Sequence, residues 1–146
     1  MKSSGSVSLI LSNKKGPVWS VPPDTTVFEA IKMMAERDVG ALLVMEGDRL
    51  VGVISERDYT RKVALKGKSS RETKVAEILS SHVISVTPSH SIDECMRLMT
   101  SHRVRHLPVV DSGKVTGMIS IGDLVNWTIS AQDATIEQLE SYILGR

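Results

Sequence analysis

The chain has 146 residues, 41% of them hydrophobic and 24% charged, which predicts a globular unit large enough to bury a real core. This composition excludes collagen-like and wholly disordered chains. The 18 Lys and Arg residues nearly balance the 17 Asp and Glu residues, so no overall basic charge points to nucleic acid as a partner.

The first predicted unit covers residues 7–65 and begins with an apolar lead-in at 6–11. Pro23 ends a first short strand, and Thr26 and Glu29 have the spacing of a capping box that opens a helix. Two apolar runs separated by a turn then predict a hairpin, and a second helix follows it. The predicted strand, helix, strand, strand and second helix start occupy residues 19–21, 26–34, 41–45, 49–55 and 55–58.

Residues 66–74 are a polar linker rich in Ser, Lys and Gly, and a short helix is expected over Thr73–Leu79. A second unit follows at 75–128, and residues 129–146 are expected to form a C-terminal helical tail. The tail carries an apolar stripe at helical spacing, which fits packing on the body of the protein and packing on a partner chain equally well. The stripe consists of Ile129, Ile136, Leu139 and Ile143.

The two units are copies of one another. The segment that starts at Val18 aligns without a gap with the segment that starts at Val83, with thirteen identities in 41 positions. A period of 65 residues is too long for a solenoid and indicates a duplicated subdomain. Neither copy has enough strands for a good core alone. The sequence therefore predicts an α/β (α+β) fold in which two β-α-β-β-α repeats pack as one body.

Each copy ends its hairpin with the pattern Gly-hydrophobic-Ile-Ser-x-x-Asp, from Gly52 to Asp58 and from Gly117 to Asp123. A serine that opens a helix lies beside free backbone N–H groups, where a phosphate or a ribose hydroxyl is well held. An aspartate one turn later can accept hydrogen bonds from a vicinal diol. Helix capping alone explains the Ser and the Asp, but it requires neither the glycine nor the basic residues nearby. These basic residues are Arg57, Arg61, Lys62, Arg103, Arg105 and His106, of which Arg61 and Lys62 fit a solvated face equally well.

The duplicated unit and its repeated motif resemble a pair of CBS domains, known as a Bateman module. The stretch VRHLPVVDSGKVTGMISIGDLV at 104–125 is similar to the second copy of small stand-alone bacterial CBS-pair proteins, and similar sequences occur in plant organelles. The resemblance covers essentially the whole chain, so we expect no separate catalytic domain within it. It implies a pseudo-two-fold module whose pairs stack into a disc-like homodimer through their helices. The apolar stripes around Met33 and Leu98 fit such a dimer and also fit a plain core.

The resemblance also implies an adenosine-containing ligand such as AMP, ADP, ATP, NAD or an S-adenosylmethionine derivative, bound in clefts between the repeats, with no required cofactor. The aspartates of the motif would hold the ribose diol, and the serines would contact ribose or phosphate. Backbone before each hairpin would read the adenine edge, and basic residues would meet phosphate. Copy one departs from the family in having Gly40 and Ala41 before its hairpin, so the two clefts should differ. The expected binding residues are Val21, Ser55, Arg57, Asp58, Arg61, Val86, Arg105, His106, Ser120 and Asp123.

These observations predict a regulatory module that senses a nucleotide and changes conformation to modulate a protein partner that the sequence does not identify. A ligand-independent dimerisation scaffold is the alternative, and an enzyme that acts on the nucleotide is less favoured because no catalytic motif occurs.

Cys95 lies on the apolar face of a helix, where a core thiol is favoured over a nucleophile, and a single cysteine excludes an intramolecular disulfide. A helix end between His102 and His106 argues against a shared metal. Early apolar runs are too short for a signal peptide or a membrane span, which predicts a cytoplasmic protein.

Overall fold

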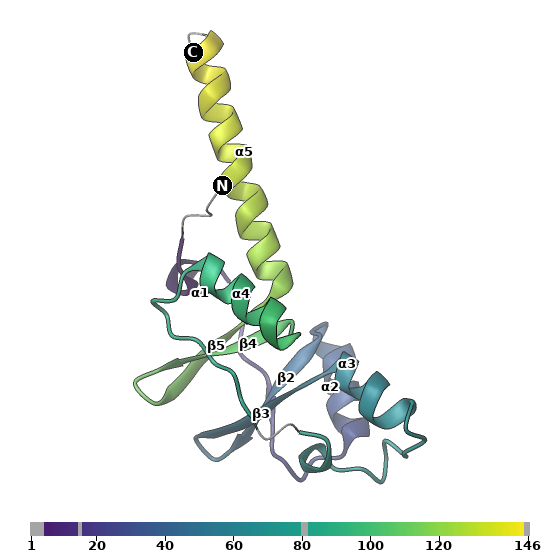
Figure 1. The fold of residues 1–146 in the computed structure, drawn as a ribbon. Helices are drawn as coiled ribbons and strands as arrows, with labels where there is room; N and C mark the ends of the chain where they lie inside the picture. Colours follow the sequence, from purple (N-terminus) through teal and green to yellow (C-terminus); the bar gives the residue numbers. More distant parts are fainter. Residues whose placement is uncertain (1–4, 15, 80–81, 145–146) are drawn as a thin grey trace.

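The computed structural model describes residues 5–14, 16–79 and 82–144. Two β-hairpins lie in the body of the molecule, helices pack around them, and one long helix projects from the body (Figure 1). The mixture of helices and strands and the tandem arrangement confirm the predicted α/β (α+β) fold.

The first repeat follows the predicted order of elements. Its strands lie in the order β1-β2-β3, with β1 parallel to β2 and β2 antiparallel to β3. The second predicted helix begins as one α-helical turn and continues as a π-helix. The elements are β1 (Ser20–Val21), α2 (Val27–Arg37), β2 (Ala41–Glu46), β3 (Arg49–Ser55), α3 (Glu56–Asp58) and η1 (Tyr59–Ala64).

The second repeat has the same plan, with α4 (Ile92–His102), β4 (His106–Asp111), β5 (Lys114–Ser120) and α5 (Ile121–Leu144). In place of the first strand, a single parallel bridge joins Val86 to Val109. Both hairpins shift register at the same point, between Val44 and Met45 in one and between Val109 and Val110 in the other. The repeat in the sequence is therefore also a repeat in three dimensions.

Side-chain caps fix where the first helix of each repeat begins. Thr26 Oγ1 accepts a hydrogen bond from the Glu29 N–H at 3.2 Å, so Thr26 caps α2. At the start of α4 the box is reciprocal, because Ser91 Oγ accepts from the Glu94 N–H while Glu94 Oε1 accepts from the Ser91 N–H. Each helix then ends at a residue with left-handed backbone, Asp38 at φ 53° and Arg103 at φ 54°.

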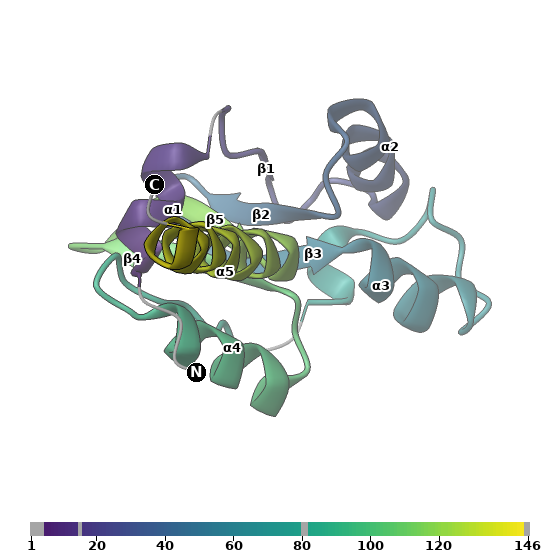
Figure 2. The same ribbon diagram turned by 90° about the horizontal axis from the view of Figure 1, so that it is seen from above.

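The segment that leads into each repeat packs on the other repeat. α1 (Val7–Asn13) places Val7 and Ile10 in the core of the second repeat, and Figure 2 shows α1 beside β5 and α5. In the same way, Val75 and Ile78 enter the core of the first repeat. Backbone hydrogen bonds hold both segments, from Val7 N to His90 O at 2.9 Å and from Val75 N to Thr25 O at 2.8 Å. The exchange makes one body of the two repeats.

The helix expected over Thr73–Leu79 is shorter than predicted. Within Thr73–Leu79, the helical part is the 3-10 helix η2 (Val75–Glu77). Lys74 forms an antiparallel bridge with Thr26, and Thr73 O accepts from Val27 N at 2.8 Å. These contacts hold the backbone extended as far as Lys74, so a helix cannot begin earlier.

The C-terminal tail is not a separate helix. α5 runs without interruption through Leu144, a length of about 36 Å at the rise of an α-helix. Leu124 is fully buried and Trp127 packs against the second core, whereas Ile129 is 51% exposed and Ile143 is 76% exposed. The apolar stripe of the tail therefore does not pack on the body of its own chain (Figure 1). The last two residues of the predicted tail, 145–146, lie outside the described residues.

Candidate functional site

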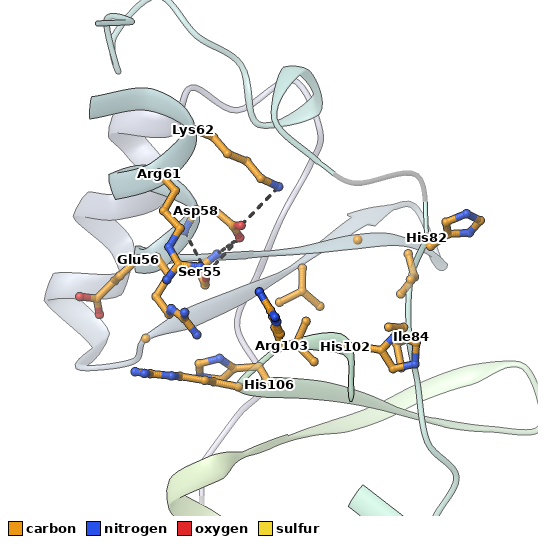
Figure 3. A pocket seen from close by; sticks show the side chains of 17 residues that line it. Ser55, Glu56, Asp58, Arg61, Lys62, His82, Ile84, His102, Arg103 and His106 are labelled. Carbon is orange, nitrogen blue, oxygen red and sulfur yellow. Dashed lines mark hydrogen bonds and ion pairs between the residues drawn. The ribbon is translucent and has the colours of Figure 1, made fainter. Parts of the chain in front are cut away.

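A cavity of about 590 Å³ lies between the two repeats (Figure 3). This volume is in the range of cavities that bind small molecules. We call it the first cleft. The first repeat lines it with Gly40, Gly52, Val53, Ser55, Glu56, Arg57, Asp58, Arg61 and Lys62. The second repeat lines it with His82, Val83, Ile84, His102, Arg103, Val104, Arg105 and His106.

Ser55 and Asp58 form a closed capping box at the end of β3. Asp58 Oδ2 accepts hydrogen bonds from the Ser55 N–H at 2.8 Å and from Ser55 Oγ at 3.0 Å, and Ser55 Oγ accepts from the Asp58 N–H at 3.2 Å. Asp58 Oδ1 lies 3.4 Å from Lys62 Nζ. The cap therefore uses one carboxylate oxygen, and the other oxygen is available to a ligand that displaces or shares the lysine.

Among the described residues, five cationic side chains face this cleft against two carboxylates, those of Glu56 and Asp58. In Figure 3, Arg61 and Lys62 extend from the first repeat, and Arg103 lies on the opposite side of the cavity. The positive charge of Arg105, followed by that of Arg61, lowers the pKa of Arg57, and Asp58 opposes the shift. Like charges held this close together repel one another, and a bound anion would relieve the repulsion.

His106 lies at the start of β4, against Gly40 of the other repeat. Burial is the main cause that lowers its pKa, and the charge of Lys14 adds to the effect. Asp123 and Asp58 both raise the pKa of His106, so this imidazole senses the motif aspartates of both repeats. His106 is therefore placed between the two positions where the resemblance predicts ligands.

The second repeat carries the corresponding motif from Gly117 to Asp123. Its capping box is also formed, because Asp123 Oδ2 accepts from the Ser120 N–H at 2.8 Å and Ser120 Oγ accepts from the Asp123 N–H at 3.1 Å. Lys14, which caps the C-terminus of α1, donates from Nζ to Asp123 Oδ2 at 2.9 Å and to Met118 O at 2.9 Å. The motif aspartate of the second repeat is therefore ion-paired with Lys14, which follows α1.

The glycine of each motif has a packing role. A Cβ atom on Gly52 would meet Leu79 Cδ2 at 3.0 Å, and one on Gly117 would meet Leu11 Cδ2 at 2.7 Å. Both leucines belong to the exchanged lead-in segments. The glycines that helix capping left unexplained are therefore explained by this close approach, without a ligand.

The structure brings six of the ten predicted binding residues into the first cleft and leaves four outside it. Ser120 and Asp123 lie at the corresponding motif of the second repeat and do not line this cavity. Val21 and Val86 are 3% and 1% exposed and do not line the cavity. The backbone groups of Val86 are also hydrogen-bonded to β4, because its N–H donates to Pro108 O at 3.0 Å and its carbonyl accepts from Val110 N at 2.8 Å. The six residues in the first cleft are Ser55, Arg57, Asp58, Arg61, Arg105 and His106.

The first cleft also has an apolar end, formed by Val83 and Ile84 beside His82, which the sequence pattern did not predict. These residues stand two to four positions before Val86 in the same extended segment. Figure 3 places Ile84 and His82 at the end of the cavity away from Glu56 and Arg61.

Other chemistry receives no support from the described residues. Cys95 is fully buried, and burial raises the pKa of its thiol to about 11, which confirms a core role. Among the described side chains, no group of three or more His, Cys, Asp and Glu is placed to hold a metal ion. None of the helices in the described ranges has the length and apolar surface that a membrane crossing needs.

Comparisons with known proteins agree with this geometry. The family model for the CBS domain matches residues 11–65 and 75–130. The chain is 41% identical over 127 residues to the CBS domain-containing protein CBSX3, mitochondrial, of Arabidopsis thaliana. That match covers 84% of this chain and 62% of the plant protein, so the chain spans less than two thirds of that relative's length.

Two solved structures have the same fold over most of the chain. A CBS-domain protein from Burkholderia ambifaria MC40-6, described as a candidate signal-transduction protein, has a TM-score of 0.84 at 50% identity, covering 88% of this chain and 96% of its own. The CBS domain protein PAE2072 from Pyrobaculum aerophilum, solved in complex with AMP, has a TM-score of 0.69 at 28% identity, covering 84% of this chain and 89% of its own. The names of these relatives mention no enzymatic activity.

Proposed function

The chain belongs to the CBS-domain family as a regulatory or signalling protein with a CBS pair, and we propose that it acts by binding an adenosine-containing nucleotide in the first cleft. The observation that carries the proposal is the pairing of Asp58 with an excess of cations across one cavity. A carboxylate suits a ribose diol, and a crowd of Arg and Lys side chains suits phosphate.

Each part of a nucleotide has a matching group in the first cleft. Asp58 Oδ1 is the acceptor for a ribose hydroxyl, with Lys62 moving to a phosphate as the hydroxyl takes its place. Arg57, Arg61 and Arg105 surround the phosphates. Val83 and Ile84 supply the apolar surface on which an adenine ring packs. The AMP complex of the Pyrobaculum aerophilum relative supports this ligand class, and ADP, ATP and NAD share its adenosine portion.

A nucleotide in the first cleft would touch both repeats at once. Asp58 and Arg61 belong to the first repeat, whereas Arg105 and Ile84 belong to the second. Occupancy therefore biases the angle between the repeats, and a changed surface is the signal that a partner protein would read. Modulation of that partner and a cytoplasmic location stay predictions.

Calorimetric titration with AMP, ADP, ATP and NAD tests the proposal. Asp58→Asn keeps an acceptor for the cap but removes the charge, and we expect it to weaken AMP binding about ten- to a hundred-fold, the usual effect of losing a hydrogen bond to a charged group. Asp48→Asn, in the exposed turn between β2 and β3, is the matched control and should bind as wild type does.

The diol contact has a separate test in 2′-deoxyadenosine monophosphate. Wild type should bind it more weakly than AMP, whereas Asp58→Asn should bind both about equally, because the contact is already lost. If wild type bound none of the adenosine ligands, the function would pass to the scaffold alternative. Equal binding of AMP by wild type and Asp58→Asn would refute the role given to Asp58.

We also propose that the chain forms a homodimer through α5. Val125, Ile129, Ile136, Leu139 and Ile143 recur at steps that fit a heptad seam, in which Gln132 fills the remaining core position. All five apolar side chains are at least 45% exposed. Isoleucine at the a positions with leucine at a d position favours a parallel two-stranded coiled coil. A second copy is the fitting partner, because Gln132 would face its own counterpart and one amide can donate where the other accepts.

Light scattering during size-exclusion chromatography tests the dimer. Ile136→Asp places a charge in the proposed seam and should give a monomer at micromolar concentration. Ser141→Asp adds the same charge on the opposite face of α5 and should leave the dimer intact. A monomeric wild type, or a dimer that withstands Ile136→Asp, would refute this use of α5.

A further inference from the structure

His106 lies where the two repeats meet. It opens β4 opposite Ser120 of β5, and its ring faces Gly40 of the first repeat, where a Cβ atom would lie 3.6 Å from both Cε1 and Nε2. His106 also lines the first cleft, and Figure 3 shows it on the side of the cavity opposite Asp58. In the alignment of the two copies the equivalent residue is Ala41, so one copy of the module carries this imidazole and the other does not.

Charged groups from every element around His106 act on its imidazole. Burial is the main cause that lowers its pKa, and the ammonium group of Lys14 is the next. Asp123 raises the pKa, Arg105 lowers it, and Asp58 raises it. The charged groups that face the ring are Lys14 after α1, Glu56 and Asp58 in α3, Arg105 before β4, and Asp123 in α5. The other charged or titratable side chains that line the cavity are Arg57, Arg61, Lys62, His82, His102 and Arg103.

Without a ligand, this imidazole is neutral near pH 7, because burial and the neighbouring cations disfavour a further positive charge. No residue in the described ranges forms a hydrogen bond with its ring nitrogens, so they are available to a ligand. A nucleotide phosphate among Arg57, Arg61 and Arg105 would bring negative charge into the same cavity. Negative charge within about 4–6 Å favours a protonated imidazole and raises its pKa.

We propose that His106 takes up a proton from solvent when a nucleotide binds in the first cleft, and that the imidazolium then donates to a phosphate oxygen. This proposal rests on the proposed function of the first cleft. By linkage, uptake of a proton on binding means that the affinity for the nucleotide rises as the pH falls. At a fixed nucleotide concentration, occupancy of the first cleft therefore depends on pH as well as on the nucleotide.

The size of the effect follows from the change in the pKa of His106 on binding. A rise by one pH unit gives at most a tenfold gain in affinity. Between pH 7.5 and 5.5 we therefore expect NAD to bind about three- to ten-fold more tightly, with uptake of about half a proton per NAD near pH 6. NAD is the probe because its two phosphates are diesters, whereas a phosphate monoester such as AMP has a second pKa of about 6 and titrates in the same range.

Calorimetric titration with NAD at pH 7.5, 6.5 and 5.5 tests the proposal. Each titration is made in two buffers of different ionisation enthalpy, which gives the affinity and the number of protons taken up. His106→Gln keeps a side chain that can hydrogen-bond but cannot titrate, so its affinity should change little with pH and proton uptake should be lost. His106→Asn is a second such variant if His106→Gln unfolds. His90→Gln, outside the cleft, is the matched control and should keep the pH dependence of wild type.

The outcomes separate this proposal from the function on which it rests. Equal affinity of wild type for NAD at pH 7.5 and 5.5 would overturn the role of His106 and leave the first cleft standing. Unchanged proton uptake in His106→Gln, or its loss in His82→Gln or His102→Gln, would also overturn that role. If AMP binds and NAD does not, the same comparison is made with AMP, and subtracting the His106→Gln values removes the contribution of the phosphate. Absence of NAD and AMP binding to wild type at all three pH values would overturn the proposed function itself.

Discussion

Because the lead-in segments are exchanged, we expect Ile10 to stabilise the second repeat, although it precedes the first repeat in the sequence. Ile10 is 5% exposed and lies in the core of the second repeat. Replacing a buried isoleucine with alanine costs about 2–5 kcal/mol, and alanine returns up to about 0.5 kcal/mol through its better helix propensity. We therefore expect Ile10→Ala to lower the free energy of unfolding by about 2–4 kcal/mol. For a chain of this size the melting temperature should fall by about 5–12 °C.

Native-state hydrogen exchange shows where that loss occurs. Ile10→Ala should speed exchange in α4, β4 and β5 more than in α2, β2 and β3, although Ile10 precedes the first repeat in the sequence. Ile78→Ala is the mirror experiment, because Ile78 is also 5% exposed but lies in the first core. It should speed exchange in α2, β2 and β3. If each variant loosened the repeat that follows it in sequence, the exchange of segments would be refuted.

Three further predictions follow from burial and close contact. Cys95 should react with a thiol reagent at least a hundred-fold more slowly in the native than in the unfolded protein, because its pKa of about 11 leaves little thiolate. Equal reaction rates in the two states would place the thiol outside the core. Burial, followed by the charge of Lys14, lowers the pKa of His106 below its ordinary 6.5. Near this pH the folded chain therefore binds fewer protons than the unfolded chain, and it loses stability as the pH falls through 6.5. Urea unfolding at pH 7.5 and 5.5 should show the loss, reduced in His106→Gln; an unchanged pH dependence in that variant would contradict this role. Gly117→Ala should lower the free energy of unfolding by about 1–2 kcal/mol, because the added methyl group overpacks against Leu11, and by much less in a Leu11→Ala background. Additive effects of the two substitutions in thermal unfolding would contradict the contact.

Local chemistry was sufficient to predict most of the fold. Thr26 and Ser91 cap helices where their spacing to a glutamate predicts, and both hairpins turn where the sequence places small and acidic residues. The alignment of the copies also predicted the matching motifs at Asp58 and Asp123, which form the same capping box. These features depend on residues a few positions apart, and such patterns can be read directly from the chain.

Features that depend on distant residues were not predicted. Val7 and Ile10 are apolar at helical spacing, but nothing in that pattern says which of two similar cores receives them. The contact of Lys14 with Asp123 follows from that choice and was missed with it. The continuity of α5 was different, because no proline or glycine interrupts the sequence between Asp123 and Leu144. There the signal was present, and the boundary at residue 129 divided one helix.

The crossed lead-in segments also determine the order in which this chain can fold. The core of the first repeat lacks Val75 and Ile78 until the chain has been made past them, and the core of the second repeat needs Val7, which precedes the first repeat in the sequence. Contacts such as Val7 N to His90 O close a loop that includes the whole first repeat, and closing long loops slows folding. Emergence of the first repeat from the ribosome therefore cannot by itself complete a native domain. The two repeats must therefore fold together in one cooperative step, which cannot be completed until the second repeat has been made.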